Sequence, residues 1–249
     1  MSNIILADFP FQFSWDENDC SLENIKAYML LESDSFIANI IKAAGISTND
    51  QIRQLLNSKS IDRFKIIIDS FVRDLPDTIS DIKNLRDDFL IQEWILLGAI
   101  TENILQIFLS VYLRDYKNSK WKLWDNFNSS FKDDIFLFID GELKKGIITQ
   151  EQSKSFKNAV KNKIKEHTQK PEVDKLMLDS LIQFYTDEHI IDKEFIAELK
   201  IIQMNRNCVH LFLNRNISDI KQLVHSIYFM GRLINELNYR LPTYGDNEK

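Results

Sequence analysis

A polar turn late in the chain, residues 203–210, holds the side chains best suited to chemistry, in the order Gln-Met-Asn-Arg-Asn-Cys-Val-His. Arg206 and His210 are four residues apart, so they would lie on one face of a helix. On an apolar helix such a pair is costly unless its members are paired or bind a ligand. Histidine can exchange a proton near neutral pH, and arginine can hold a phosphate with two hydrogen bonds. The turn therefore suits cleavage of an RNA phosphodiester without a metal ion.

In that reaction His210 would be the general acid or base, Arg206 would stabilise the transition state, and Asn207 would position a neighbour or the ligand. One histidine cannot easily serve as acid and base at once, whereas a symmetric dimer would bring two such turns together. The sequence thus predicts a homodimer with an RNA substrate. Two other interpretations stay open. The arginine and histidine could form a structural pair that hydrogen-bonds a neighbouring helix, or the turn could grip the phosphate of a nucleotide without turnover.

Glu102 is a charged residue within the most apolar segment of the chain. Residues 94–105 are apolar nearly all round, which predicts a central buried helix, and Gly98 would let another helix approach closely. A carboxylate in that setting needs a partner. The simpler interpretation is a pair with a local lysine or arginine. The functional alternative is that Glu102 orients Arg206 or His210.

The scarcity of helix breakers indicates the fold class. Only 6 glycines and 4 prolines occur in 249 residues, which leaves little room for hairpins and tight turns. Caps and apolar periodicity predict an all-α helical bundle. Its expected helices cover residues 21–44 (stopped by Gly45), 47–56, 61–72, 80–116 (one or two helices), 133–145, 149–168, 173–185, 192 to 212 or 213, and 218–241, with Asp192 and Ser218 as caps of the last two.

The chain divides into four expected regions. The first has Phe9, Phe11, Phe13 and Trp15 at a period of two, which indicates an extended aromatic arm over the chain's own core or over a partner subunit. The regions are an extended N-terminal arm (1–20), an N-terminal helical region (21–78), the main helical bundle (79–242) and a disordered tail (243–249).

Lysines gather in two places where nucleic acid could bind. Residues 116–131 form an expected loop or short helix with tryptophans among lysines, which could stack bases but more often caps the end of a bundle. The next expected helix, 149–168, begins with a capping box from Thr149 to Gln152. It carries a basic stripe that could contact RNA or simply be solvated, formed by Lys154, Lys157, Lys161 and Lys165.

The overall composition narrows the classes of function. A net charge of −6 disfavours wholesale coating of nucleic acid, and the two cysteines form neither a zinc motif nor a disulfide framework. We expect no cofactor and no metal. The strongest apolar stretch, 94–113, is interrupted by polar residues, and the N-terminus lacks a basic leader. We therefore expect a cytoplasmic protein without a membrane segment. His225, on an apolar face, is expected to be a core or interface residue.

The Arg206-Asn207 pair followed by His210, near a late long helix of an all-α domain, resembles the HEPN superfamily. The preceding apolar helix with its internal glutamate is similar as well. The resemblance covers residues 91–241 and leaves the first three helices unexplained. It implies a helical, commonly dimeric protein, and many such proteins are metal-independent ribonucleases in toxin–antitoxin and antiviral defence systems. Arg206 and His210 would then be catalytic, with a cognate antitoxin or other protein as partner. Three residues separate them, fewer than is usual in the family.

Overall fold

The computed structural model describes residues 22–76, 87–168, 171–209 and 217–242, and every regular element within these ranges is a helix. The predicted all-α class is therefore confirmed. The α-helices are α1 (Leu22–Ile46), α2 (Asp50–Leu55), α3 (Ser58–Asp74), α5 (Asp87–Val111), α6 (Leu113–Asn118), α7 (Lys120–Lys144), α8 (Gln150–Thr168), α9 (Leu178–Asp187), α10 (Lys193–Arg206) and α11 (Ile220–Tyr239). Two short 3₁₀ helices are η1 (Val173–Lys175) and η2 (Asn207–Val209).

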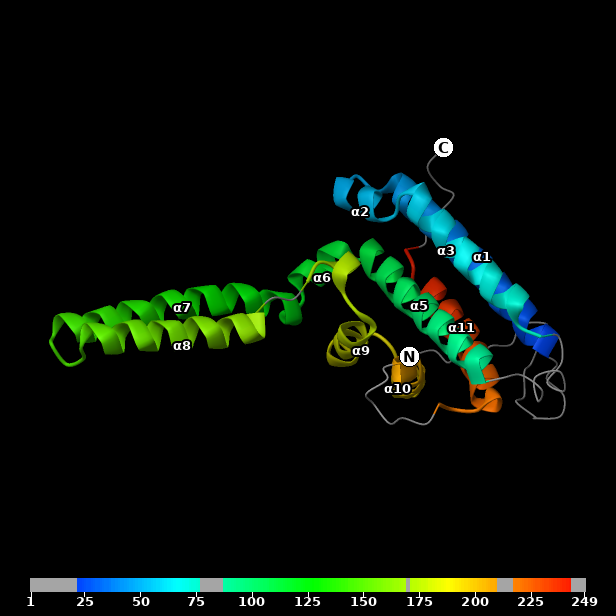
Figure 1. Cartoon of the computed structure of the whole chain (residues 1–249). Helices are drawn as coiled ribbons and strands as arrows, with labels where there is room; N and C mark the ends of the chain where they lie inside the picture. Colours follow the sequence, from blue (N-terminus) through cyan, green and yellow to red (C-terminus); the bar gives the residue numbers. More distant parts are fainter. Residues whose placement is uncertain (1–21, 77–86, 169–170, 210–216, 243–249) are drawn as a thin grey trace.

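Helix α5 is the central element of the bundle. It packs against α1, α3, α9, α10 and α11, and it lies among them in Figure 1. Trp94, Leu97, Ile100 and Ile104 on this helix are all fully buried, as the apolar pattern predicts. By length and composition residues 88–111 could also cross a membrane, but more than half of that window is buried inside the protein. Such burial is typical of the core helix of a soluble protein.

The N-terminal helices share one core with the rest of the bundle. Helix α1 runs along α11, and α3 packs on both α1 and α5. Gly231 on α11 lies directly against the ring of Tyr28, where an added Cβ would sit 2.7 Å from two of the ring carbons, Cδ1 and Cε1. The predicted arm (1–20) and tail (243–249) lie outside the described residues, and the division near residue 79 stays a prediction.

Helices α7 and α8 form an antiparallel hairpin that projects away from the bundle in Figure 1. The expectation of a loop or short helix over residues 116–131 is wrong, because α7 begins at Lys120 and continues for 25 residues. Ser119 caps it by accepting a hydrogen bond from the backbone N–H of Lys122. No proline interrupts the following turns, so a capped helix can propagate although its apolar stripe is irregular. The predicted capping box is confirmed by reciprocal bonds between Thr149 and Gln152.

Several predicted boundaries are wrong. The helix predicted at 47–56 covers Asp50–Leu55, the one at 61–72 covers Ser58–Asp74, and the one at 173–185 is η1 followed by α9. Helix α1 continues through Gly45 to Ile46, and Asp219 rather than Ser218 caps α11, with its side chain accepting from the backbone N–H of Gln222. Helix α10 begins after Asp192, as expected, but ends at Arg206 instead of residue 212 or 213. Beyond it the backbone tightens into η2, a common way for a helix to satisfy its last carbonyl groups.

Candidate functional site

The candidate catalytic residues lie where α10 ends. Arg206 is the last residue of α10, and Asn207 is its C-cap, whose backbone N–H bonds the carbonyls of Asn205 and Gln203. Because residues 207–209 are 3₁₀ rather than α-helical, the assumption that Arg206 and His210 share one α-helical face does not hold. His210 itself lies outside the described residues, so its distance from Arg206 stays a prediction.

Glu102 is the partner of Arg206. Its Oε2 lies 2.7 Å from Nη1 of the arginine, across the contact between α5 and α10. The same oxygen accepts the backbone N–H of Leu178 at 2.9 Å. The N-cap residue of α9, Met177, offers no side-chain cap, so Glu102 takes that role. The expected carboxylate–cation pair is present and joins Glu102 to Arg206. Both the functional alternative and a structural arginine–histidine pair that bonds a neighbouring helix include this contact.

The side chain of Arg206 packs closely on Gly98 of α5. A Cβ at position 98 would lie 2.5 Å from Cδ, 2.8 Å from Cγ and 2.9 Å from Cβ of Arg206. The aliphatic stem of Arg206 therefore packs on the bare backbone of α5, and the carboxylate of Glu102, one turn further along α5, receives its guanidinium. The side chains of Arg206 and Glu102 keep 24% and 18% of their surface exposed. The pair is thus partly desolvated but still accessible to a ligand.

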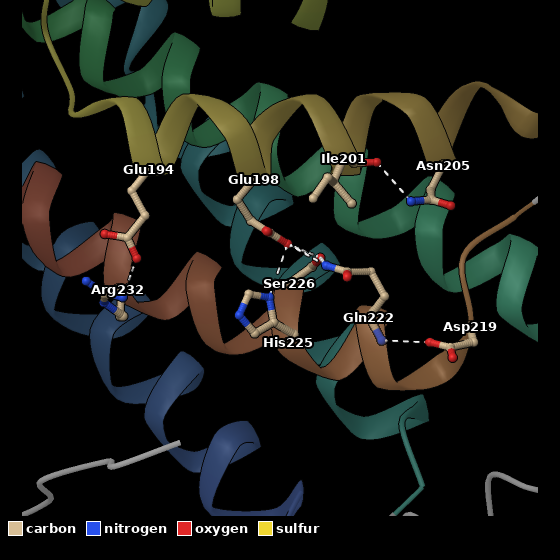
Figure 2. Close-up of polar contacts among 9 residues, drawn as sticks. All are labelled: Glu194, Glu198, Ile201, Asn205, Asp219, Gln222, His225, Ser226 and Arg232. Atoms are coloured by element: carbon tan, nitrogen blue, oxygen red, sulfur yellow. Dashed lines mark hydrogen bonds and ion pairs between the residues drawn. The ribbon is translucent and has the colours of Figure 1, made fainter. Parts of the chain in front are cut away.

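The sequence interpretation missed Asn205, the residue just before the arginine. Its side chain is almost fully buried and donates to the carbonyl of Ile201, as Figure 2 shows. Its Oδ1 accepts the backbone N–H of Ser218 at 2.6 Å, while Trp94 donates to the Ser218 carbonyl at 3.4 Å. The chain that returns toward α11 is therefore fixed beside the end of α10. The available signal was an asparagine one turn after Ile201 and Ile202, on the apolar side of a helix.

A second polar cluster joins α10 to α11 and was also missed. Figure 2 shows the carboxylate of Glu198 accepting hydrogen bonds from Ser226 and, at 3.1 Å, from Gln222. Nδ1 of His225 lies 3.5 Å from the same carboxylate oxygen. Among the described contacts the serine hydroxyl bonds the glutamate rather than the histidine, so this cluster lacks the nucleophile–base bond of a catalytic triad. We interpret the cluster as a set of structural hydrogen bonds that hold α10 against α11.

The four lysines of the predicted stripe lie in different environments. Lys157 forms an ion pair with Asp140 on α7 at 2.6 Å, and both Lys157 and Lys161 lie over the ring of Phe136. Lys154 is exposed, and the side chain of Lys165 lies outside the described residues. At least Lys157 is therefore occupied within the hairpin, which weakens the case for a continuous RNA-binding stripe.

The tryptophan-and-lysine segment after Tyr116 is also largely structural where it is described. Trp121 packs against the rings of Tyr116 and Phe184 at the end of the bundle. This contact agrees with the capping interpretation rather than with base stacking.

Comparison of this chain with protein-family models, with curated proteins and with solved structures finds no match. Function is therefore inferred from the residues alone.

Breaking the Glu102–Arg206 pair should destabilise the bundle. Glu102→Ala removes the partner of the guanidinium and uncaps the Leu178 N–H, so we expect the free energy of unfolding to fall by about 1 to 2 kcal/mol. Arg206→Ala should cost a similar amount, and the double variant should cost less than the two combined because it leaves no unpaired charge. Urea unfolding of the three variants measures this coupling.

Glu236→Ala is the matched control for that cycle. Glu236 on α11 bonds Arg240, the C-cap residue one turn further on, and more than a third of each side chain is exposed. Its loss should therefore cost below about 0.5 kcal/mol. Strict additivity of Glu102→Ala and Arg206→Ala would contradict the pairing.

Proposed function

We propose that this chain is a HEPN-like, metal-independent endoribonuclease that acts in the cytoplasm, in a defence or toxin–antitoxin setting. The observation that carries the proposal is the placement of Arg206. Glu102 and Gly98 hold the arginine in one position, a quarter exposed, immediately before Asn207 and the segment with His210. An arginine fixed in advance stabilises developing charge without reorganisation.

The reaction would be an internal transesterification of RNA. His210 takes the proton of a 2′-hydroxyl, whose oxygen attacks the adjacent phosphorus. Arg206 stabilises the added negative charge on the phosphoryl oxygens, and Asn207 positions the substrate. The bond to the 5′-oxygen breaks, and a protonated histidine donates the proton that this oxygen needs. In a homodimer the second histidine comes from the other copy. The products are a 2′,3′-cyclic phosphate and a free 5′-hydroxyl.

The test is cleavage of RNA with mixed single-stranded and structured regions by the full chain in excess EDTA. We expect fragments with 2′,3′-cyclic phosphate ends, and a fall in rate of about 100-fold or more in His210→Ala. Arg206→Lys keeps a positive charge but loses the planar fork, so it should also lower the rate.

His189→Asn is the matched control. His189 is exposed and has a φ of 53°, a conformation that asparagine tolerates well. Its variant should therefore fold and cleave RNA as the unaltered chain does. Equal rates for the unaltered chain and for His210→Ala would refute the assignment.

A second candidate function is a non-catalytic helical interaction module. It is favoured by the ion pair itself, because a guanidinium already neutralised by Glu102 is a weaker clamp for phosphate. Arg206 also sits at the C-terminal end of α10, where helix carbonyls disfavour an anion. Under this proposal the folded chain binds a partner protein and leaves RNA intact. Retained circular dichroism without any cleavage would support it.

A further inference from the structure

The hairpin of α7 and α8 projects away from the bundle (Figure 1) and carries large apolar side chains that are exposed. Phe138 is 68% exposed, Leu137 72%, Phe156 49% and Ile147 64%. Among the described residues α8 packs mainly on α7, and α7 contacts the bundle only near its first turn, through α6 and through Trp121 against Phe184 on α9. Two helices alone cannot bury apolar residues on more than their shared seam. The hairpin therefore leaves apolar surface that ordinary solvation does not explain.

The exposed phenylalanines gather on one flank of the hairpin. Phe136 faces the flank with Lys157 and Lys161, and Phe138, two residues on, points about 200° away around α7. On α8, Phe156 lies about 140° from Lys161, which turns it toward the flank of Phe138. The Lys157–Asp140 pair sets the register and places Phe138 and Phe156 at nearly the same level. We call this surface the phenylalanine flank, with Phe138 and Phe156 at its centre.

The two helices of the hairpin carry opposite charge. Helix α8 has five lysines against two glutamates, whereas α7 has five acidic residues against four lysines. A second hairpin turned about a two-fold axis along the arm would place each α7 against the α8 of the other copy. That arrangement pairs acidic with basic helices and makes all neighbouring helices antiparallel.

We propose that the phenylalanine flank is the dimer interface of this chain, and that its occupant is the same flank of a second copy, in an antiparallel four-helix bundle. The register brings Phe138 of one copy against Phe156 of the other. The 19 residues of α8 span about 28 Å, and two helices side by side are about 20 Å wide, so each copy would bury roughly 550 Å². The total of about 1,100 Å² just exceeds what a specific interface needs, roughly 1,000 Å².

The nuclease proposal also invokes a homodimer, but the interface is tested apart from it, because the oligomeric state is measured without RNA. Sedimentation of the full chain from about 1 to about 100 µM should show a dimer at the upper concentrations. Phe138→Glu/Phe156→Glu should remain monomeric throughout that range, because the change places like charges face to face. Both substituted side chains are exposed in the single copy, so the variant should keep its circular dichroism and its melting temperature.

Ile66→Glu is the matched control, since Ile66 is 66% exposed on α3, in the bundle rather than on the hairpin. It should form the dimer as the unaltered chain does. A dimer that persists in Phe138→Glu/Phe156→Glu would place the interface elsewhere and overturn the proposal. An unaltered chain that stays monomeric at every concentration would overturn it as well. The phenylalanine flank would then bind either the N-terminal residues of the same chain or another protein.

Discussion

Gly98→Ala is expected to lower the free energy of unfolding by about 2 to 3 kcal/mol. The added methyl would meet three carbons of Arg206, including the Cβ, at 2.5 to 2.9 Å. A Cβ cannot swing aside as the end of a long side chain can, so α5 and α10 must move apart. That movement also lengthens the contact between Arg206 and Glu102. The gain in helix propensity, about 1 kcal/mol, offsets only part of this cost. Urea unfolding at neutral pH measures the change.

Gly45→Ala is the control with the opposite expected sign. Gly45 is also helical, in α1, but an added Cβ there meets nothing within 4 Å. Its substitution should raise the free energy of unfolding by about 0.5 to 1 kcal/mol, because alanine has the lower entropy in the unfolded chain. Equal changes in the free energy of unfolding for Gly98→Ala and Gly45→Ala would show that the close packing of Arg206 on Gly98 is unimportant for stability.

Local sequence signals predicted the helical class and much of the helix order. The scarcity of glycine and proline over the whole chain indicated the helical class. The start at Asp192 and the capping box at Thr149 depend on a few neighbouring residues, where a single sequence is most informative. The apolar run around Leu97 predicted a central helix, and Trp94, Leu97 and Ile100 there are fully buried, although Ile95 on the opposite side of the helix is 37% exposed. Helix ends were harder, since Gly45 carries no signal that distinguishes a helix interior from a stop.

The site was only partly predictable, because its contacts join residues far apart in the sequence. A carboxylate on a buried helix requires a cation, and this predicted a pair for Glu102, but the choice of Arg206 depends on how α5 crosses α10. The Glu198 cluster was missed because its donors come from α11. The spacing of Gln222 and Ser226, one turn apart on a largely apolar helix, was the signal available.

Glu93 is a buried carboxylate that the sequence interpretation also missed. It lies on α5 with no exposed surface, and among the described residues neither of its oxygens has a hydrogen-bond partner. Burial, with a smaller contribution from the charge of Asp74 at the end of α3, raises the pKa of Glu93 from 4.5 to about 7. The folded protein therefore holds a proton on Glu93 in a pH range where the unfolded chain has lost it.

Glu93→Gln is expected to make the protein more stable than the unaltered chain at pH 8, by about 3 kcal/mol. Because the folded pKa is raised, the folded state binds more protons between pH 4.5 and 7, and stability falls as the pH rises through that window. Glutamine removes this loss, so the difference between the two proteins should be small below pH 4.5, grow up to pH 7 and then level off. Urea unfolding from pH 4 to pH 8 follows the difference.

Two further variants identify the cause of the effect. Glu151→Gln changes an exposed carboxylate on α8. The difference in free energy of unfolding between this variant and the unaltered chain should stay nearly constant from pH 4 to pH 8. Asp74→Asn removes the smaller of the two causes and keeps the burial, so it should move the pH window slightly downward without abolishing it. A difference between Glu93→Gln and the unaltered chain that stays constant from pH 4 to pH 8 would mean that Glu93 is ionised at a normal pKa. Glu93 would then need a partner or a solvent contact other than those among residues 22–76, 87–168, 171–209 and 217–242.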